Sequence, residues 1–140
     1  MADVEIQSEA ANTLQRWAEL WSSHKINELL TLFTDDSTYE DVTFGVVNRS
    51  KHELKAFAEG IFAAFPDFAL TLTSKFVATG WAAMEWVITG THVGDLPGIP
   101  ATQKRFSIRG ATILELDGPK IRRNSDYWDL ATFLKQVGLS

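Results

Sequence analysis

The feature that most constrains this chain is a change of apolar periodicity at Pro66. Before that residue, apolar side chains recur every three or four positions, which is typical of amphipathic helices. After it, apolar and polar residues alternate, as in Phe68-Ala-Leu-Thr-Leu-Thr, which is typical of half-buried strands. Helices followed by a run of strands is the order of an α+β fold, so we expect helices packed on one face of a sheet.

Two helices are expected near the N-terminus. Residues 8–23 carry apolar side chains at helical spacing. A second apolar stripe runs from residue 26 to residue 33, and the acidic pair at 35–36 is expected to end it. Residues 37–41 then have the pattern of a short extended segment.

The third predicted helix has the clearest start in the sequence. Ser50 followed by Glu53 forms a capping box, in which a serine hydroxyl and a glutamate side chain satisfy free backbone N–H groups. An apolar stripe then runs from Leu54 to Phe65. Pro66 is expected to end the helix, because proline has no backbone N–H to continue the hydrogen-bond ladder.

The second half of the chain predicts a meander of strands. The expected extended segments are 68–73, 81–92, 105–116 and 120–128. A short last helix follows and is ended by Gly138. Three helices on one face of a strongly curved sheet would leave a conical interior, and without linkers or repeats we expect residues 1–140 to form a single domain.

The connection from Val93 to Thr102 has two interpretations. It is too long for a tight hairpin, and it carries the apolar residues Leu96 and Ile99. One interpretation is a flap over the mouth of a cavity. The other is a stiff connection whose two apolar residues pack on the rim of the sheet.

Composition limits the classes of partner. The net charge is -5, so no basic surface is expected for nucleic acid or for an anionic membrane. The chain has no cysteine, which excludes disulfides and thiolate metal sites. No apolar run approaches the roughly 18 residues of a membrane span, and the N-terminus is acidic, so we expect a cytoplasmic protein. Five Trp and nine Phe are enough to line a pocket for a flat ligand.

The chain resembles the SnoaL-like polyketide cyclases over nearly its whole length. The segments that carry the resemblance are Phe65–Asp67, Gly90–Gly94, Gly98–Thr102, Arg105–Ser107, Asp117–Arg122, Asp126–Asp129 and Gln136–Gly138. The resemblance implies an NTF2-like α+β cone, in which three N-terminal helices pack on a strongly curved, mostly antiparallel sheet that encloses a pocket. It also implies an intramolecular aldol ring closure without a metal or other cofactor.

Asp126 corresponds to the acid/base aspartate of the characterised cyclases. Strand alternation places Asn124 and Trp128 on its face and Tyr127 on the other, so we expect Asn124 and Trp128 to contact the substrate. An aspartate in an aromatic pocket is disfavoured as an anion, which makes it a better base. The structural alternative is an Asp126 that pairs with Arg122 or Arg123 or that caps the last helix, although Asp129 is better placed for the cap.

A shorter segment, Phe33–Asp41, resembles the part of ketosteroid isomerases that carries their general base, and Asp41 falls on that base. Two carboxylates in one cavity would have different pKa values and could act separately as acid and base. The alternative is an Asp41 that holds the turn at 42–45. Trp17 stands where those isomerases have an oxyanion-hole tyrosine; an indole N–H donates a hydrogen bond but cannot act as an acid.

Three more residues complete the candidate site. His92 ends a predicted strand and could orient or protonate a substrate oxygen, or it could hold the loop that follows. Thr112 stands where the characterised cyclase has a pocket histidine, and its hydroxyl could hold a ligand oxygen. Trp86 is expected in the pocket wall or the core.

Three functions remain open from the sequence. The first is a cofactor-free cyclase or isomerase that removes a proton from a small hydrophobic carbonyl compound, with polycyclic molecules among the candidates. The second is a non-catalytic domain that binds such a ligand. The third is an assembly module that pairs through its open sheet face, and we expect a homodimer or a higher homo-oligomer.

Overall fold

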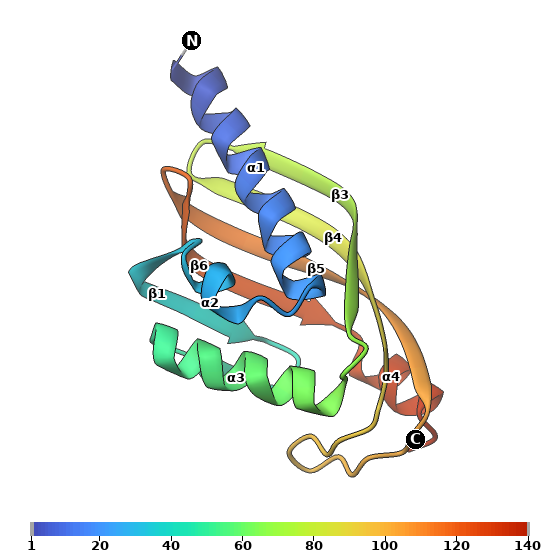
Figure 1. Ribbon diagram of the computed structural model, residues 1–140. Coiled ribbons are helices and arrows are strands. Elements are labelled where there is room, and N and C mark those ends of the chain that lie inside the picture. Colours follow the sequence, from blue (N-terminus) through green and yellow to red (C-terminus); the bar gives the residue numbers. More distant parts are fainter. Residues whose placement is uncertain (1, 140) are drawn as a thin grey trace.

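The computed structural model describes the backbone of residues 2–139 and the side chains of residues 7–139, which form helices on a six-stranded curved sheet (Figure 1). In chain order the elements are α1 (Ala2–Ser22), α2 (Ile26–Leu30), β1 (Phe33–Asp41), β2 (Val46–Asn48), α3 (Lys51–Ala64), β3 (Ala69–Ala78), β4 (Trp81–Thr91), β5 (Arg105–Asp117), β6 (Lys120–Trp128) and α4 (Leu130–Gln136).

The sheet is open and mostly antiparallel. Its strand order is β2-β1-β6-β5-β4-β3, and the pairing of β1 with β6 is parallel. Figure 1 shows α1 and α2 lying across the sheet, α3 running beside β1, and α4 beside the start of β5. The predicted α+β cone is therefore confirmed, and its interior lies between the helices and the concave face of the sheet.

The helix boundaries follow the local sequence signals. Ser50 caps α3, because its hydroxyl accepts a hydrogen bond from the backbone N–H of Glu53 at 3.1 Å. The Glu53 carboxylate in turn accepts from the backbone N–H of Arg49 at 2.6 Å, one residue earlier than the capping box expects. None of the described helices is both long enough and apolar enough to cross a membrane.

The second helix is shorter than predicted. It ends at Leu30, and Phe33 is buried at the start of β1 instead of lying on a helix. The backbone N–H of Ile121 donates to the carbonyl of Leu32 at 2.8 Å, so pairing with β6 replaces the helical hydrogen bonds here. The short strand β2 was not predicted, because three residues are too few to show an alternating pattern.

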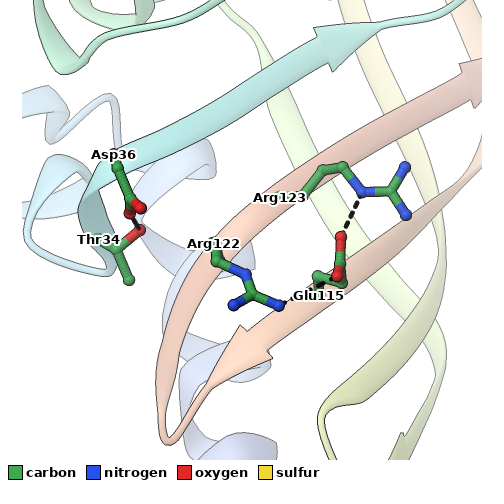
Figure 2. A network of polar contacts seen from close by, with 5 residues as sticks. All are labelled: Thr34, Asp36, Glu115, Arg122 and Arg123. Atoms are coloured by element: carbon green, nitrogen blue, oxygen red, sulfur yellow. Dashed lines mark hydrogen bonds and ion pairs between the residues drawn. The ribbon is translucent and has the colours of Figure 1, made fainter.

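The four predicted strands of the second half are confirmed. An irregularity in the pairing of β5 with β6 also explains a cluster of ion pairs on the surface. The register shifts at Glu115 and Leu116, which places the consecutive residues Arg122 and Arg123 within reach of the same carboxylate. Arg122 and Arg123 hold the two oxygens of Glu115 at 3.1 and 2.7 Å (Figure 2). The alternative in which either arginine pairs with Asp126 is therefore wrong.

The connection between β4 and β5 is a packed segment. Leu96 is buried, and its backbone exchanges two hydrogen bonds of 2.9 Å with Ile99. A Cβ atom on Gly94 would lie 2.7 Å from the carbonyl oxygen of Ala63, so the loop passes against the end of α3 with no side chain between them. No residue of this connection lines the internal cavity described below, which favours the stiff connection over the flap.

Candidate functional site

The concave face of the sheet encloses a cavity of about 60 Å³ with a mainly aromatic wall. Side chains from α1, α3, α4 and all strands except β2 contribute to the wall. Asp41 and Asp126 are the two carboxylates that reach it, and Tyr39 adds a phenol. The cavity is thus apolar over most of its surface, with its ionisable groups gathered on two strands.

The parallel pairing of β1 with β6 brings these ionisable groups together. In this register Asp41 lies opposite Asp126, and Tyr39 lies opposite Asn124. Neighbouring strands are about 4.8 Å apart, and residues two positions apart point to the same face. The four side chains therefore form one inward-facing cluster, although about 85 residues separate its two halves in the sequence.

Asp126 is held by three hydrogen-bond donors. Its Oδ1 atom accepts from the hydroxyl of Thr112 at 2.6 Å and from the side-chain amide of Asn124 at 2.8 Å. Its Oδ2 atom accepts from the hydroxyl of Tyr39. The residue is only 7% exposed, so these donors replace water as the partners of the carboxylate.

Burial raises the pKa of Asp126 to about 6, and the nearby charge of Asp41 acts in the same direction. The hydrogen bonds from Thr112, Tyr39 and Asn124 oppose this rise, because they favour the charged form. Burial raises the pKa of Tyr39 well above its ordinary value, so the phenol keeps its proton and donates it to Asp126. At neutral pH Asp126 is thus a mostly ionised carboxylate in an apolar cavity.

Asp41 both holds the turn after β1 and faces the cavity, the two alternatives that the sequence left open. Its Oδ1 atom accepts from the backbone N–H of Phe44 at 2.8 Å, which holds the turn after β1. Its Oδ2 atom accepts from the indole N–H of Trp128 at 3.1 Å, and its side chain also lines the cavity. Burial raises the pKa of Asp41, while the hydrogen bonds from Phe44 and Trp128 lower it.

Four of the five tryptophans lie in the cavity wall, and three of these use their N–H groups within the protein. The Trp17 indole donates to the Asn124 side-chain oxygen at 3.0 Å. The Trp86 indole donates to the Thr112 hydroxyl at 2.8 Å, and Trp128 donates to Asp41. The Trp21 indole N–H is buried and has no hydrogen-bond partner in the part of the chain that the structure describes.

Thr112 and Asn124 were expected to contact the substrate, but neither lines the cavity. Both are fully buried behind it, and both reach Asp126. Their hydrogen-bonding groups are used by Asp126 and by Trp86 or Trp17. The structure therefore places them as supports of the carboxylate.

His92 lies apart from this cluster. It is buried, its Nδ1 atom is 3.1 Å from the hydroxyl of Thr102, and its ring packs against Phe65 and Phe133. Burial lowers the pKa of His92, which favours the neutral ring. His92 does not line the cavity, and its contacts are those of the structural alternative, a histidine that holds the following loop.

Tyr39 is the site residue that the sequence reasoning did not single out. It stands two positions before Asp41 on the same strand, so alternation alone places both side chains on one face. That signal was available in the sequence. The contact with Asp126 was not, because it depends on which strand pairs with β1.

Replacing Tyr39 by Phe should raise the pKa of Asp126 further, because the Oδ2 atom loses its donor while its burial is unchanged. The measurement is a titration of the Asp126 carboxyl carbon by NMR, with Asp126→Asn to assign the signal. Tyr127→Phe is the matched control, since Tyr127 is next in sequence but half-exposed on the opposite face of β6. Equal titrations in the Tyr39 variant and the native protein would contradict this role.

The residues of the cavity do not form an evident metal site. Within the described part of the chain, no group of three or more His, Asp or Glu side chains is arranged to hold a metal ion. The polar atoms around the two carboxylates are hydrogen-bond donors from Tyr39, Thr112, Asn124 and Trp128. This arrangement suits proton transfer and the binding of a ligand oxygen.

Comparison with known proteins agrees with this geometry. The sequence profile of the SnoaL-like polyketide cyclase family matches residues 11–137, which include every residue that lines the cavity. The chain belongs to this family. The resemblance seen in the sequence motifs is therefore confirmed.

Two curated relatives of this SnoaL-like protein come from Streptomyces. The nogalonic acid methyl ester cyclase of Streptomyces nogalater is 36% identical over 88 residues, which cover 60% of this chain and 66% of that protein. An aklanonic acid methyl ester cyclase of Streptomyces peucetius is 34% identical over 58 residues, which cover 41% of this chain and 40% of that protein. The chain thus spans at most about two thirds of the length of these relatives.

Solved structures show the same architecture. A Catenulispora acidiphila protein with a ketosteroid isomerase-like fold, solved in complex with trimethylamine, superimposes with a TM-score of 0.81 at 26% identity. The match covers 91% of this chain and 93% of that protein. The predicted cone fold of this SnoaL-like protein is confirmed by this likeness.

Proposed function

We propose that this SnoaL-like protein catalyses ring closure of a small hydrophobic carbonyl compound, with Asp126 as the general acid/base. The observation that carries the proposal is the buried Asp126 carboxylate in an apolar cavity, whose pKa of about 6 keeps it ionised yet basic near neutral pH. The curated relatives, which are methyl ester cyclases, support the same class of reaction.

The proposed reaction is an intramolecular aldol addition. The Asp126 carboxylate removes a proton from the carbon next to a substrate carbonyl, which leaves an enolate. The enolate carbon attacks a second carbonyl of the same molecule, a C–C bond forms, and the proton held by Asp126 returns to the new alkoxide oxygen. Asp41 lies on the adjacent strand and, in its protonated form, would donate a hydrogen bond to one of the two oxygens while keeping its proton.

Trp21 is a candidate donor for a substrate oxygen. Trp21 lines the cavity, and its indole N–H is buried without a hydrogen-bond partner among the described residues. A buried N–H without a partner costs about 1–3 kcal/mol, and a ligand that supplies an acceptor removes this cost. A carbonyl compound meets that requirement, whereas a hydrocarbon does not.

The size of the cavity bears on the size of the substrate. Its volume of about 60 Å³ is far below the roughly 300 Å³ of a typical drug-sized ligand site. A polycyclic substrate therefore requires aromatic side chains of the wall to move, and we propose that α4, with Phe133, is the part that yields. It is a short helix at the end of the cone (Figure 1).

The test uses nogalonic acid methyl ester as the probe, with ring closure followed by chromatography and mass spectrometry. We expect turnover whose kcat/KM rises through about pH 6 as Asp126 ionises, and loss of that turnover in Asp126→Asn. Asp41→Asn distinguishes the roles of the two carboxylates. If Asp41 only supports the reaction, this variant has a lower rate but keeps the rise of kcat/KM near pH 6. Full activity in Asp126→Asn would contradict the proposal.

The second candidate function is a non-catalytic binding domain. It is favoured by the same apolar cavity, which needs no reactive group to hold a ligand. It predicts that the native protein and Asp126→Asn bind the ester with equal affinity and that neither converts it. Binding without turnover in the native protein would therefore select this alternative.

We also propose that two copies pair through the outer face of the sheet. This face exposes four large apolar or aromatic residues, one on each of the neighbouring strands β3, β4, β5 and β6: Phe76, Trp81, Ile113 and Tyr127. Sedimentation velocity should give a homodimer for the native protein and a monomer for Ile113→Lys. A native monomer at micromolar concentration would contradict this proposal.

A further inference from the structure

We propose that Trp17 and Trp86 are positioning residues, which act through Asn124 and Thr112 to make both partners of the Asp126 Oδ1 atom hydrogen-bond donors. Neither indole N–H bonds to Asp126 itself; each bonds instead to the residue behind it. The inference rests on the proposed role of Asp126 in catalysis only where it concerns rates. The hydrogen-bond directions themselves follow from the chemistry of the four side chains.

The first arm passes through Thr112. A threonine hydroxyl has one proton and can donate or accept, so its direction depends on its neighbours. The indole N–H of Trp86 is a donor only and lies 2.8 Å from the Thr112 oxygen, which must therefore accept this bond. The single hydroxyl proton is left for the Asp126 Oδ1 atom at 2.6 Å.

The second arm passes through Asn124, whose amide has an accepting end and a donating end. The Trp17 indole N–H lies 3.0 Å from one end, which must be the oxygen, since an indole can only donate. The NH₂ group then faces Asp126 Oδ1 at 2.8 Å. The reversed amide would bring two N–H groups together at Trp17 and two oxygens together at Asp126, so it is excluded.

The packing of Trp86 depends on Gly110, its partner residue on β5. A Cβ atom at Gly110 would lie 2.2 Å from the Trp86 ring, well inside van der Waals contact. The indole thus passes over the glycine and reaches Thr112, two residues further along the same strand. Gly110 is therefore part of the first arm, although it has no polar side chain.

The consequence concerns the charge state of Asp126. Two fixed donors on Oδ1 favour the carboxylate over the protonated acid, which could itself donate to a free hydroxyl or amide oxygen. The titratable groups that face Asp126 are Tyr39 and Asp41, both on β1; β4, β5, β6 and α1 contribute the neutral residues of the two arms. The indoles therefore help to keep Asp126 ionised in spite of its burial.

The test is an NMR titration of the Asp126 carboxyl carbon in the full chain without substrate. Trp86→Phe frees the Thr112 hydroxyl, and Trp17→Phe frees the Asn124 amide. In each variant the titration midpoint of Asp126 should rise, so that Asp126 becomes about a tenfold weaker acid. Gly110→Ala should have the same effect as Trp86→Phe, because it displaces the indole. An unchanged midpoint in folded variants of both arms would overturn the inference.

Two further tryptophans are matched controls for the loss of an indole from the cavity wall. Trp21 donates to no described residue, so Trp21→Phe should leave the Asp126 midpoint unchanged. Trp128 donates to Asp41, so Trp128→Phe should raise the pKa of Asp41 and, by reducing its negative charge, lower that of Asp126. Equal upward shifts in all four tryptophan variants would mean that cavity packing, not hydrogen-bond direction, sets the titration, and would overturn the inference.

Double variants separate a positioning role from a general structural one. In a Thr112→Val background the hydroxyl is already absent, so adding Trp86→Phe should not move the Asp126 midpoint again. The same is expected when Trp17→Phe is added to Asn124→Leu. A shift of undiminished size in both backgrounds would show that the indoles act by another route, and would overturn the inference.

A shape-preserving substitution covers the case in which a phenylalanine variant does not fold. Benzothienylalanine at position 86 replaces the indole N–H by sulfur with nearly the same outline, and it should raise the Asp126 midpoint as Trp86→Phe does; no change would overturn the inference. With the ester probe, the pH at which kcat/KM rises should shift by the same amount as the titration midpoint of Asp126. If the ester is not converted, the titrations still decide the inference, so its failure is distinguishable from that of the proposed function.

Discussion

Asp126→Asn is expected to lose turnover by at least about 100-fold and, at the same time, to be more stable than the native protein above pH 6. The loss follows because an amide cannot accept the substrate proton. The gain follows because the amide is neutral and carries no desolvation cost for a charge in the buried site. A residue kept at the expense of stability is typical of a functional site.

The sign of the pH dependence follows from the direction of the shift. The pKa of Asp126 is raised from 3.8 to about 6 in the folded protein, so the folded state holds its proton more tightly than the unfolded state. The stabilisation from this group is complete below about pH 4 and is lost as the pH rises through 6. The shift corresponds to about 3 kcal/mol. Above pH 7 we therefore expect the free energy of unfolding of Asp126→Asn to exceed that of the native protein by on the order of 1–3 kcal/mol.

Denaturant unfolding at pH 4.5 and pH 8 measures this effect. The difference in free energy of unfolding between Asp126→Asn and the native protein should grow between these two values. Asp129→Asn is the control, because Asp129 caps α4 at the surface and its pKa is lowered by its hydrogen bonds with Thr132, so its contribution to stability is lost only below about pH 4 and should stay nearly constant between pH 4.5 and pH 8. A destabilised Asp126→Asn at pH 8 would contradict the buried ionised carboxylate.

Phe133→Ala is expected to cost about 3–5 kcal/mol of stability and to enlarge the set of ligands that the cavity accepts. Phe133 is 1% exposed, and its ring packs against Phe65, Phe106 and Trp128 at centroid distances of 6.0, 5.0 and 6.0 Å. It also lines the cavity from α4. Removing the ring therefore opens the cavity toward the end of the cone while it removes core contacts.

Thermal unfolding and binding of a bulky hydrophobic dye measure the two effects. Leu114→Ala is the matched control, since Leu114 is equally buried but does not line the cavity. It should lose about 2–5 kcal/mol of stability without any gain in ligand binding. Equal dye binding in the two variants would show that Phe133 does not limit the size of the ligand.

Strand alternation predicted the inward face of β6 correctly. Asn124 and Asp126 are buried and Tyr127 is half-exposed, as a period of two requires. The helix start at Ser50 was also predictable, because a cap is decided by residues three positions apart. Features of this kind depend on neighbours along the chain, so the sequence contains their cause.

The roles of Thr112, Asn124 and His92 were not predictable in the same way. All three are buried polar residues, but alternation does not say which partner a polar group meets. Thr112 and Asn124 bond to Asp126, whereas His92 packs beside Phe65 and Phe133 outside the cavity wall. The second helix was predicted too long for a related reason, since pairing of β1 with β6 outweighed the local apolar spacing.

By itself, the sequence determined the class of fold, the family and the face on which Asp126 lies, because periodicity, capping and motif spacing are local properties of the chain. Only the tertiary structure decided that β1 pairs in parallel with β6, and this pairing places Tyr39 and Asp41 beside Asp126. It also decided the donors behind the carboxylate, since the indoles of Trp17 and Trp86 come from α1 and β4. Charge state and hydrogen-bond direction in a buried site depend on the surrounding groups, and these come from distant parts of the chain.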